Sequence, residues 1–197
     1  MHGLIRRAAA KPYFRIAVFL DRDGVLNRAT VKNGKPYPPA TLAELQILPD
    51  APRALESLKA AGFLLIGVTN QPDVARRTQQ QEVVEAINAA LLGALPLQEM
   101  LVCYHDDRDG CECRKPLPGL LLKAAARYNI DLPSSFLIGD RGKDIETGRR
   151  AGCRTVLIDY GYAEIGLGRC PPDQTVHSLS EATAWILSRS NAAGGIV

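Results

Sequence analysis

Acidic residues directly follow two strongly apolar segments of the chain. Asp21 and Asp23 stand two positions apart behind the run at 16–20, and Asp140 follows the run at 135–138. Carboxylates crowded into one place repel each other, and a cation relieves that repulsion. Together the three residues offer the oxygen ligands that Mg²⁺ prefers. A lone Asp-x-Asp is more often a helix cap or a solvated turn, so the magnesium hypothesis depends on all three acidic residues meeting.

Two further residues have the chemistry to hold a phosphate group. Thr69 supplies a hydroxyl and a backbone amide after the apolar run at 63–68, and Lys115 supplies a compact cationic donor. A plain Thr-Asn turn and a surface lysine are the alternatives, because most lysines lie at the surface. The sequence therefore favours a phosphate site that includes Thr69 and Lys115.

A cluster of cysteine and histidine precedes Lys115. Cys103-x-His105 is followed by Cys111-x-Cys113, which places three thiols and one imidazole within eleven residues. These are ligands of closed tetrahedral zinc sites, and the spacing is tighter than that of a zinc finger. Ordinary reduced cysteines beside a surface histidine are the alternative. Since four ligands leave no position for water, we predict a structural zinc ion that fixes the loop before Lys115.

The elements that must position these residues alternate along the chain. Buried strands are predicted at 16–20, 63–68, 100–104, 135–138 and 155–158. Helices are predicted between Asp50 and Gly62, from Thr78 to about residue 92, and at 118–128, 144–151 and 180–187. The proline-rich residues 28–49 are expected to be mainly loop. This alternation predicts an α/β fold, a Rossmann-like three-layer sandwich with a mainly parallel sheet.

Ligands of open parallel sheets bind beyond the carboxyl ends of the strands. The polar clusters at Asp21, Thr69, Cys103 and Asp140 follow four of the predicted strands, so we expect them at one edge of the sheet. One domain is expected for residues 1–197, with an N-terminal arm at 1–15 and a C-terminal extension at 161–197.

The composition is that of a globular protein. The chain has 197 residues, of which 46% are apolar, and its five cysteines are an odd, clustered set that argues against a disulfide framework. Cys153 is expected in the core, whereas Cys170 and His177 carry no signal. The net charge of +3 is too small to indicate nucleic-acid binding. No apolar run approaches the ~20 residues of a membrane span, and we find no signal peptide, so a cytoplasmic location is expected.

Four segments resemble the motifs of the haloacid-dehalogenase-like phosphatases. They are residues 19–27, 68–71, 111–116 and 138–144. The zinc segment before Arg-Lys-Pro is the most specific part, and it is similar to that of the D-glycero-D-manno-heptose 1,7-bisphosphate 7-phosphatases and the related histidinol-phosphate phosphatases. The resemblance covers most of the chain, from residue 16 to about residue 160.

This resemblance implies a phosphomonoesterase that works through an aspartyl-phosphate. Asp21 would be the nucleophile, and Asp23 would act as general acid and then as general base. Mg²⁺ would be held by the Asp21 carboxylate, the Asp23 backbone carbonyl and Asp140. Thr69 and Lys115 would stabilise the transferring phosphoryl group.

The resemblance also implies how the substrate is held. Four residues would bind it: Asn70, Gln71, Arg114 and Arg141. Asp144 would orient Lys115 or a metal-bound water. Too few residues separate the motifs for a cap domain, so we expect an open, capless site beside the zinc-stapled loop. Residues 72–77 depart from the usual family pattern at the expected substrate entrance.

Several functions remain compatible with these features. The leading one is removal of the 7-phosphate from D-glycero-D-manno-heptose 1,7-bisphosphate, a step in lipopolysaccharide precursor synthesis. Histidinol phosphate is the first alternative substrate, and a polynucleotide is another, against which the low charge and missing aromatic-basic pattern argue. A zinc-bound scaffold protein would be expected to lack Asp21 or Asp140, and both are present. We expect a monomer that binds a small phosphorylated sugar, and neither nucleic acid nor membrane.

Overall fold

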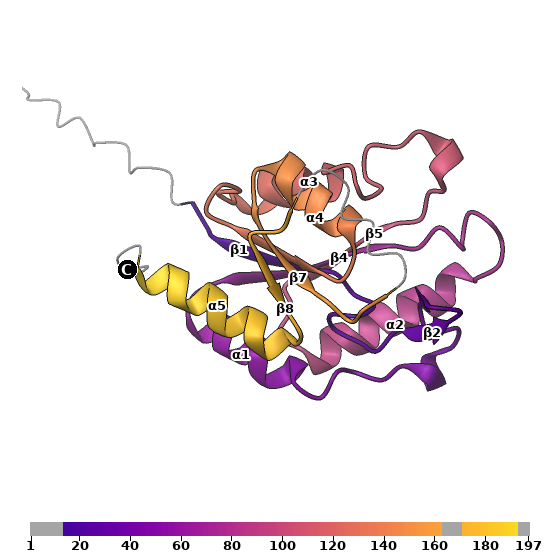
Figure 1. The fold of residues 1–197 in the computed structure, drawn as a ribbon. Helices are drawn as coiled ribbons and strands as arrows, with labels where there is room; N and C mark the ends of the chain where they lie inside the picture. The colour runs from indigo at the N-terminus through magenta and orange to yellow at the C-terminus, as the bar shows by residue number, and fades with distance from the viewer. Residues whose placement is uncertain (1–13, 163–170, 193–197) are drawn as a thin grey trace, which may run out of the picture.

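The computed structural model describes residues 14–162 and 171–192. Within this part of the chain, six parallel strands form one sheet in the order β5-β4-β1-β6-β7-β8 (Figure 1). The strands are β1 (Ala17–Leu20), β4 (Leu64–Asn70), β5 (Glu99–Cys103), β6 (Phe136–Gly139), β7 (Arg154–Ile158) and β8 (Gln174–Val176). The predicted parallel α/β fold is confirmed. The edge strand β8 was not predicted, because its three residues are too few to show a period.

The α-helices of the described part cover both faces of the sheet. One face carries α1 (Ala51–Ala60), α2 (Gln81–Ala94) and α5 (Leu179–Ala192), and the other carries α3 (Gly119–Tyr128) and α4 (Gly142–Ala151) (Figure 1). Side chains of a strand alternate between faces, so Val18 and Leu20 pack on the first face and Ala17 and Phe19 on the second. The three-layer sandwich is therefore confirmed. None of the described helices combines the length and the apolar character of a membrane span.

The central strand β1 brings the polar strand ends together. Its last residue, Leu20, is level with Gly67 of β4 on one side and with Ile138 of β6 on the other. The strands β4 and β5 lie on one side of β1, and β6, β7 and β8 lie on the other. This change of direction in the strand order creates the crevice where such folds bind ligands. The residues that follow these strand ends therefore meet at one edge.

Asp50 and Thr78 stand at two predicted helix starts, but neither caps that helix with its side chain. Asp50 precedes α1, but its carboxylate accepts hydrogen bonds from the Ser180 amide (3.0 Å) and hydroxyl (3.2 Å) at the start of α5. Thr78 lies before α2, which begins only at Gln81, and its hydroxyl donates to the backbone carbonyl of Asp73. In both cases a polar side chain near a helix start binds a different partner.

Residues 28–49 contain more regular structure than expected. They form an antiparallel hairpin, β2 (Thr30–Lys32) and β3 (Lys35–Tyr37), followed by the 3-10 turn η1 (Leu42–Glu44). Asn33 and Gly34, with φ of 52° and 73°, make the hairpin turn. No cap domain is inserted here or between β4 and α3, so the fold is capless, as expected.

The C-terminal extension supplies part of the core. Leu179, Ala182 and Ile186 of α5 are buried, and the Trp185 ring meets the Phe136 ring edge-on at 6.0 Å. At the other end of the described chain, the Arg15 amide donates a 2.9 Å hydrogen bond to the Asn129 carbonyl, and the Asp131 amide donates one of 2.9 Å to the Arg15 carbonyl. This part of the expected arm is therefore attached to the fold. Residues 1–13, Cys170 and the glycine-rich residues 193–195 lie outside the described residues.

Candidate active site

Lys115 is the centre of a buried charge cluster. Its Nζ lies 2.5 Å from Asp21 Oδ1 and 2.5 Å from Asp144 Oδ1, and it donates a 3.2 Å hydrogen bond to the Val68 carbonyl. Burial alone would lower the pKa of Lys115, but the Asp144 and Asp21 carboxylates together raise it above its usual value. The ammonium group is therefore charged at neutral pH. The structure brings the predicted pair Asp21 and Lys115 together.

Asp140 faces the same cluster without a hydrogen-bond donor. Its side chain is buried, neither carboxylate oxygen accepts a hydrogen bond from a described residue, and Arg141 Nε is 3.7 Å away. Burial raises the pKa of Asp140 well above its usual value, and the Asp21 and Asp144 charges add to this effect. Carboxylate oxygens of Asp21, Asp140 and Asp144 lie within 4.8 Å of one another. We call these three residues the acidic trio, and a divalent cation would satisfy its unpaired oxygens.

Two glycines make room for the acidic trio. A Cβ at Gly24, where φ is +95°, would lie 2.2 Å from Asp140 Oδ2. A Cβ at Gly139 would lie 2.2 Å from the Asp144 Cβ. Contacts this short do not occur between real side chains, so the turn after β1 and the end of β6 require glycine to bring their backbones this close to the carboxylates.

A separate polar network holds Asp23. Arg22 is completely buried, its Nε donates to both Asp23 oxygens at 3.2 and 3.1 Å, and its Nη1 donates to Asn88 on α2 at 3.0 Å. Asn27 and Gln71 each donate a further 3.0 Å hydrogen bond to the Asp23 carboxylate. The Asp23 side chain is thus not part of the acidic trio. The roles of Arg22 and Asn88 were not predicted, because residues 66 positions apart carry no local signal of their contact.

The polar residues at the end of β4 position their neighbours. The Asn70 amide donates to the Lys115 carbonyl at 3.0 Å and accepts from the Lys115 amide at 3.1 Å. The Gln71 amide donates to the Thr69 hydroxyl at 2.8 Å. Asn70 and Gln71, which were predicted as substrate ligands, therefore already bind protein groups. Both still line the cavity described next.

A cavity of about 190 Å³ opens above these residues, and we call it the catalytic cavity. Asp21, Asp23 and Thr69 lie on its wall together with five cationic side chains. These cations are Arg76, Arg114, Lys115, Arg141 and Lys143. Charge-assisted hydrogen bonds from such donors suit a phosphorylated ligand.

Two of these cations, Arg76 and Lys143, were not predicted. Lys143 lies in the first turn of α4, where burial and then the charge of Arg141 lower its pKa. Its position three residues after Asp140, which follows β6, is a signal that could have identified it. Arg76 belongs to the segment that departs from the family pattern, and it pairs with Asp106 and Asp73.

The loop before Lys115 also holds Arg114 at the cavity. Arg114 Nε donates to Asp107 Oδ1 at 2.6 Å, and its Nη1 donates to the His105 carbonyl at 3.4 Å. Asp107 begins the short 3-10 turn η2 (Asp107–Asp109) inside the cysteine and histidine cluster. The geometry of this cluster therefore affects where the guanidinium of Arg114 lies.

The four predicted zinc ligands are brought together. Cys103 Sγ lies 3.7 Å from Cys111 Sγ and 3.2 Å from Cys113 Sγ, and the last two sulfurs are 3.5 Å apart. His105 Nδ1 lies 3.3 Å from Cys113 Sγ and 3.7 Å from Cys103 Sγ. Tetrahedral zinc, with Zn–S bonds of about 2.3 Å, separates its thiolates by about 3.8 Å. The cluster therefore fits a zinc ion, and its cysteines form no disulfide.

Comparisons with known proteins agree with this fold. Residues 112–182 match the HAD-hydrolase-like family model. The chain is 34% identical to the D-glycero-beta-D-manno-heptose-1,7-bisphosphate 7-phosphatase of Pseudomonas aeruginosa, over 82% of this chain and 91% of that protein. It is 36% identical to the protein of the same name from Pasteurella multocida, over 84% of this chain and 93% of that protein.

A solved structure extends the comparison. The D,D-heptose 1,7-bisphosphate phosphatase of Bordetella bronchiseptica, complexed with magnesium and phosphate, has a TM-score of 0.75 and 28% identity. The match covers 88% of this chain and 99% of that one. The present chain therefore belongs to the haloacid-dehalogenase-like phosphatases, a family of phosphoric monoester hydrolases.

Proposed function

We propose that the chain is a Mg²⁺-dependent phosphatase that removes the 7-phosphate from D-glycero-D-manno-heptose 1,7-bisphosphate. The observation that carries the proposal is the buried Asp21 carboxylate beside the charged Lys115 and beside Asp140, whose oxygens accept no hydrogen bond from a described residue. The names of the relatives support the choice of substrate. The magnesium and phosphate in the Bordetella bronchiseptica structure support the choice of metal.

The acidic trio fits Mg²⁺, because Asp140 is buried with two carboxylate oxygens that lack donors. The carboxylates of Asp21 and Asp140 would hold the ion together with the backbone carbonyl of Asp23. Bound there, Mg²⁺ would offset the negative charges of the phosphate and of the carboxylates. Asp144 belongs to the acidic trio but is engaged by Lys115, so we assign it the role of positioning that lysine.

Asp21 is the nucleophile of the proposed reaction. A carboxylate oxygen of Asp21 forms a bond to phosphorus while the bond from phosphorus to the sugar oxygen breaks. Asp23, held by Arg22 and Gln71, donates its proton to the leaving sugar oxygen. Water then attacks the phosphorus of the aspartyl-phosphate, Asp23 accepts its proton, and Asp21 is regenerated.

Two groups stabilise the phosphoryl group during both steps. Lys115 Nζ is fixed by two carboxylates, so its charge is already in place when the phosphate arrives. The Thr69 hydroxyl accepts from Gln71, which leaves its own proton free to donate to a phosphate oxygen. Arg114 and Arg141 at the cavity wall would bind the remainder of the substrate.

The proposal includes a structural role for zinc. A zinc ion on the four cysteine and histidine ligands would fix the loop whose next residues are Arg114 and Lys115. We further propose that the chain acts as a monomeric single domain in the cytoplasm. The single domain is supported by β8 and α5, which complete the sheet and the core.

A comparison of substrates tests this function. We would measure kcat/KM with Mg²⁺ for both anomers of the heptose bisphosphate, for histidinol phosphate and for a 5′-phosphorylated oligonucleotide. The surplus of cations around the cavity favours a second phosphate and disfavours the amine of histidinol phosphate. We expect one heptose anomer to exceed the other substrates by roughly 100-fold. A preference for histidinol phosphate or for the oligonucleotide would overturn the proposed substrate.

A further inference from the structure

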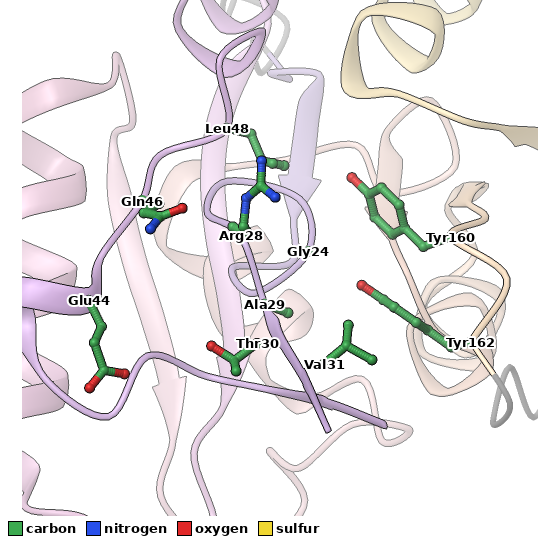
Figure 2. Close-up of a pocket in the computed structure, with 10 residues that line it drawn as sticks. All are labelled: Gly24, Arg28, Ala29, Thr30, Val31, Glu44, Gln46, Leu48, Tyr160 and Tyr162. Carbon is green, nitrogen blue, oxygen red and sulfur yellow. The ribbon is translucent and has the colours of Figure 1, made fainter. Parts of the chain in front are cut away.

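A second and larger cavity, of about 620 Å³, lies beside the β2–β3 hairpin (Figure 2). Its volume is within the range of about 300–1,000 Å³ that small-molecule sites have. Thr30 and Val31 of β2 line this cavity, whereas Pro36 and Tyr37 of β3 line the catalytic cavity. The two linings share no residue. The hairpin therefore separates two cavities, and we call the larger one the hairpin cavity.

The dividing wall is held in place from both ends. Arg141 Nη2 donates a 2.9 Å hydrogen bond to the Pro36 carbonyl, which ties the hairpin to the start of α4. At the base of the wall, Gly24 lines the hairpin cavity and packs against Asp140 on its other side. A ligand of the hairpin cavity would thus be a different molecule from the one whose phosphate meets Asp21.

Three hydrogen-bond donors face this space. The side chains of Tyr160 and Tyr162 point their hydroxyls toward the region of Gly24 and Arg28, and the two rings lie 5.6 Å apart (Figure 2). Within the residues that the structure describes, neither hydroxyl nor the Arg28 guanidinium has a hydrogen-bond or ion-pair partner. Burial raises the pKa of Tyr160 to about 12, so its hydroxyl remains a donor at neutral pH. Arg28 and Tyr160 are exposed and Tyr162 is half-buried, so these donors can exchange their water for a ligand that brings acceptors and negative charge.

Other lining residues define the rest of that ligand, and the carboxylate among them, Glu44, already accepts hydrogen bonds from the Ala40 amide and the Thr41 hydroxyl. The tyrosine rings and Val31 offer apolar faces, against which a sugar ring can pack. Gln46 lies on the opposite side of Arg28 from the tyrosines and can bind hydroxyl groups (Figure 2). An inorganic anion alone would leave both the rings and Gln46 without a contact.

We propose that the hairpin cavity is a second binding site, which takes a phosphorylated sugar independently of the catalytic cavity. The phosphate binds the Arg28 guanidinium and the hydroxyls of Tyr160 and Tyr162. The sugar ring lies against the tyrosine rings, and its hydroxyls reach Gln46. The proposal does not depend on which sugar phosphate the enzyme hydrolyses.

The test is a calorimetric titration of the full chain with D-glucose 6-phosphate in the presence of Mg²⁺. The Asp21→Asn background prevents turnover. We expect two molecules per chain, one weakened roughly tenfold or more by Arg28→Gln and the other by Arg114→Gln. Arg53→Gln, an exposed arginine of α1 that lines neither cavity, is the matched control and should leave both binding events unchanged.

A second pair of variants tests the tyrosines without removing their rings. Tyr160→Phe and Tyr162→Phe keep the apolar faces, so the fold is retained while the Arg28-dependent binding event weakens. In the enzyme with Asp21 intact, Arg28→Gln should change kcat/KM for phosphate release by less than about twofold.

Two results would overturn the proposal. The first is the absence of any binding event that depends on Arg28. The second is a single binding event weakened by both Arg28→Gln and Arg114→Gln, with a raised KM for Arg28→Gln. That second result would mean that one substrate molecule occupies both cavities.

Discussion

Gly24→Ala should weaken magnesium binding far more than it weakens the fold. The added Cβ would lie 2.2 Å from Asp140 Oδ2, whereas ordinary contact begins at 3.4 Å, so the carboxylate must shift by about 3.4 − 2.2 = 1.2 Å. Mg²⁺ requires its oxygen ligands at about 2.0–2.1 Å with little tolerance. A shift of this size displaces one ligand, for which we expect a loss of about 10–100-fold in magnesium affinity.

Gly152→Ala separates this effect from backbone strain. Gly152 also has a positive φ, +83° against +95° at Gly24, but a Cβ there meets no atom within 4 Å. Both variants should lose about 1–2 kcal/mol of unfolding free energy, because an L-residue is disfavoured at positive φ. Only Gly24→Ala should change the response to the metal.

The assay is the Mg²⁺ concentration that gives half-maximal phosphate release, together with chemical denaturation in EDTA. Gly24→Ala should require about 10–100 times more Mg²⁺ than the wild type, and Gly152→Ala should match the wild type. Equal magnesium requirements for the two variants would refute the placement of the ion at Asp140.

Three further predictions concern the same region. Lys115→Met leaves Asp21 and Asp144 without their cation, so unfolding free energy in EDTA should fall by about 3–5 kcal/mol, whereas the exposed control Lys59→Met should unfold like the wild type; chemical denaturation measures both, and an unchanged value for Lys115→Met would contradict the charge cluster. Purified protein should contain one zinc ion per chain by elemental analysis, and its removal should lower Tm by about 10 °C or more. Cys113→Ser should lose the ion, whereas Cys153→Ser, which changes a buried cysteine outside the cluster, should keep it; equal zinc contents would disprove the site. Because burial raises the pKa of Asp140, a falling pH protonates this carboxylate before ordinary ones, and Mg²⁺ must displace the proton. Apparent magnesium affinity should therefore drop, by at most about tenfold per pH unit, as the pH falls from neutrality toward the usual carboxyl range, with proton release detected by calorimetry in two buffers, and a pH-independent affinity would contradict this.

The sheet could be predicted from sequence because buried parallel strands are continuous apolar runs. The runs at 16–20, 63–68 and 135–138 became three adjacent strands, and the residues after them met at one edge. The candidate metal and phosphate residues followed directly, since their positions depend on where the strands end. Asp21, Thr69 and Asp140 all lie where this reasoning placed them.

Short elements and distant partners could not be predicted in the same way. The three-residue strand β8 is identified by its pairing with β7 rather than by any pattern of its own. The Asp50 carboxylate binds Ser180 at the start of α5, a partner 130 positions away. The β2–β3 hairpin did have a local signal, because Asn33-Gly34 is a preferred turn pair, but exposed strands around a proline showed no alternation.

The same limit applies within the candidate site. Asn70 has the residue type of a substrate ligand, and only the tertiary structure shows its amide on the backbone of Lys115. Arg22 and Asn88 are similarly invisible in sequence, since a buried arginine is unusual unless it is paired. Residue type and spacing thus predicted the candidate reacting groups, whereas the groups that orient them emerged from packing.

The most direct test of the central claim is detection of a phosphoryl group on Asp21. Asp23→Asn enzyme lacks both the general acid and the general base, so it should form the aspartyl-phosphate more slowly than the wild type and then retain it, because no base activates the attacking water. We would mix this variant with Mg²⁺ and heptose bisphosphate, quench in acid and analyse the peptides by mass spectrometry. The account predicts one phosphoryl group on the peptide that contains Asp21, and none in Asp21→Asn. Release of phosphate by an enzyme that never carries this group would contradict the account.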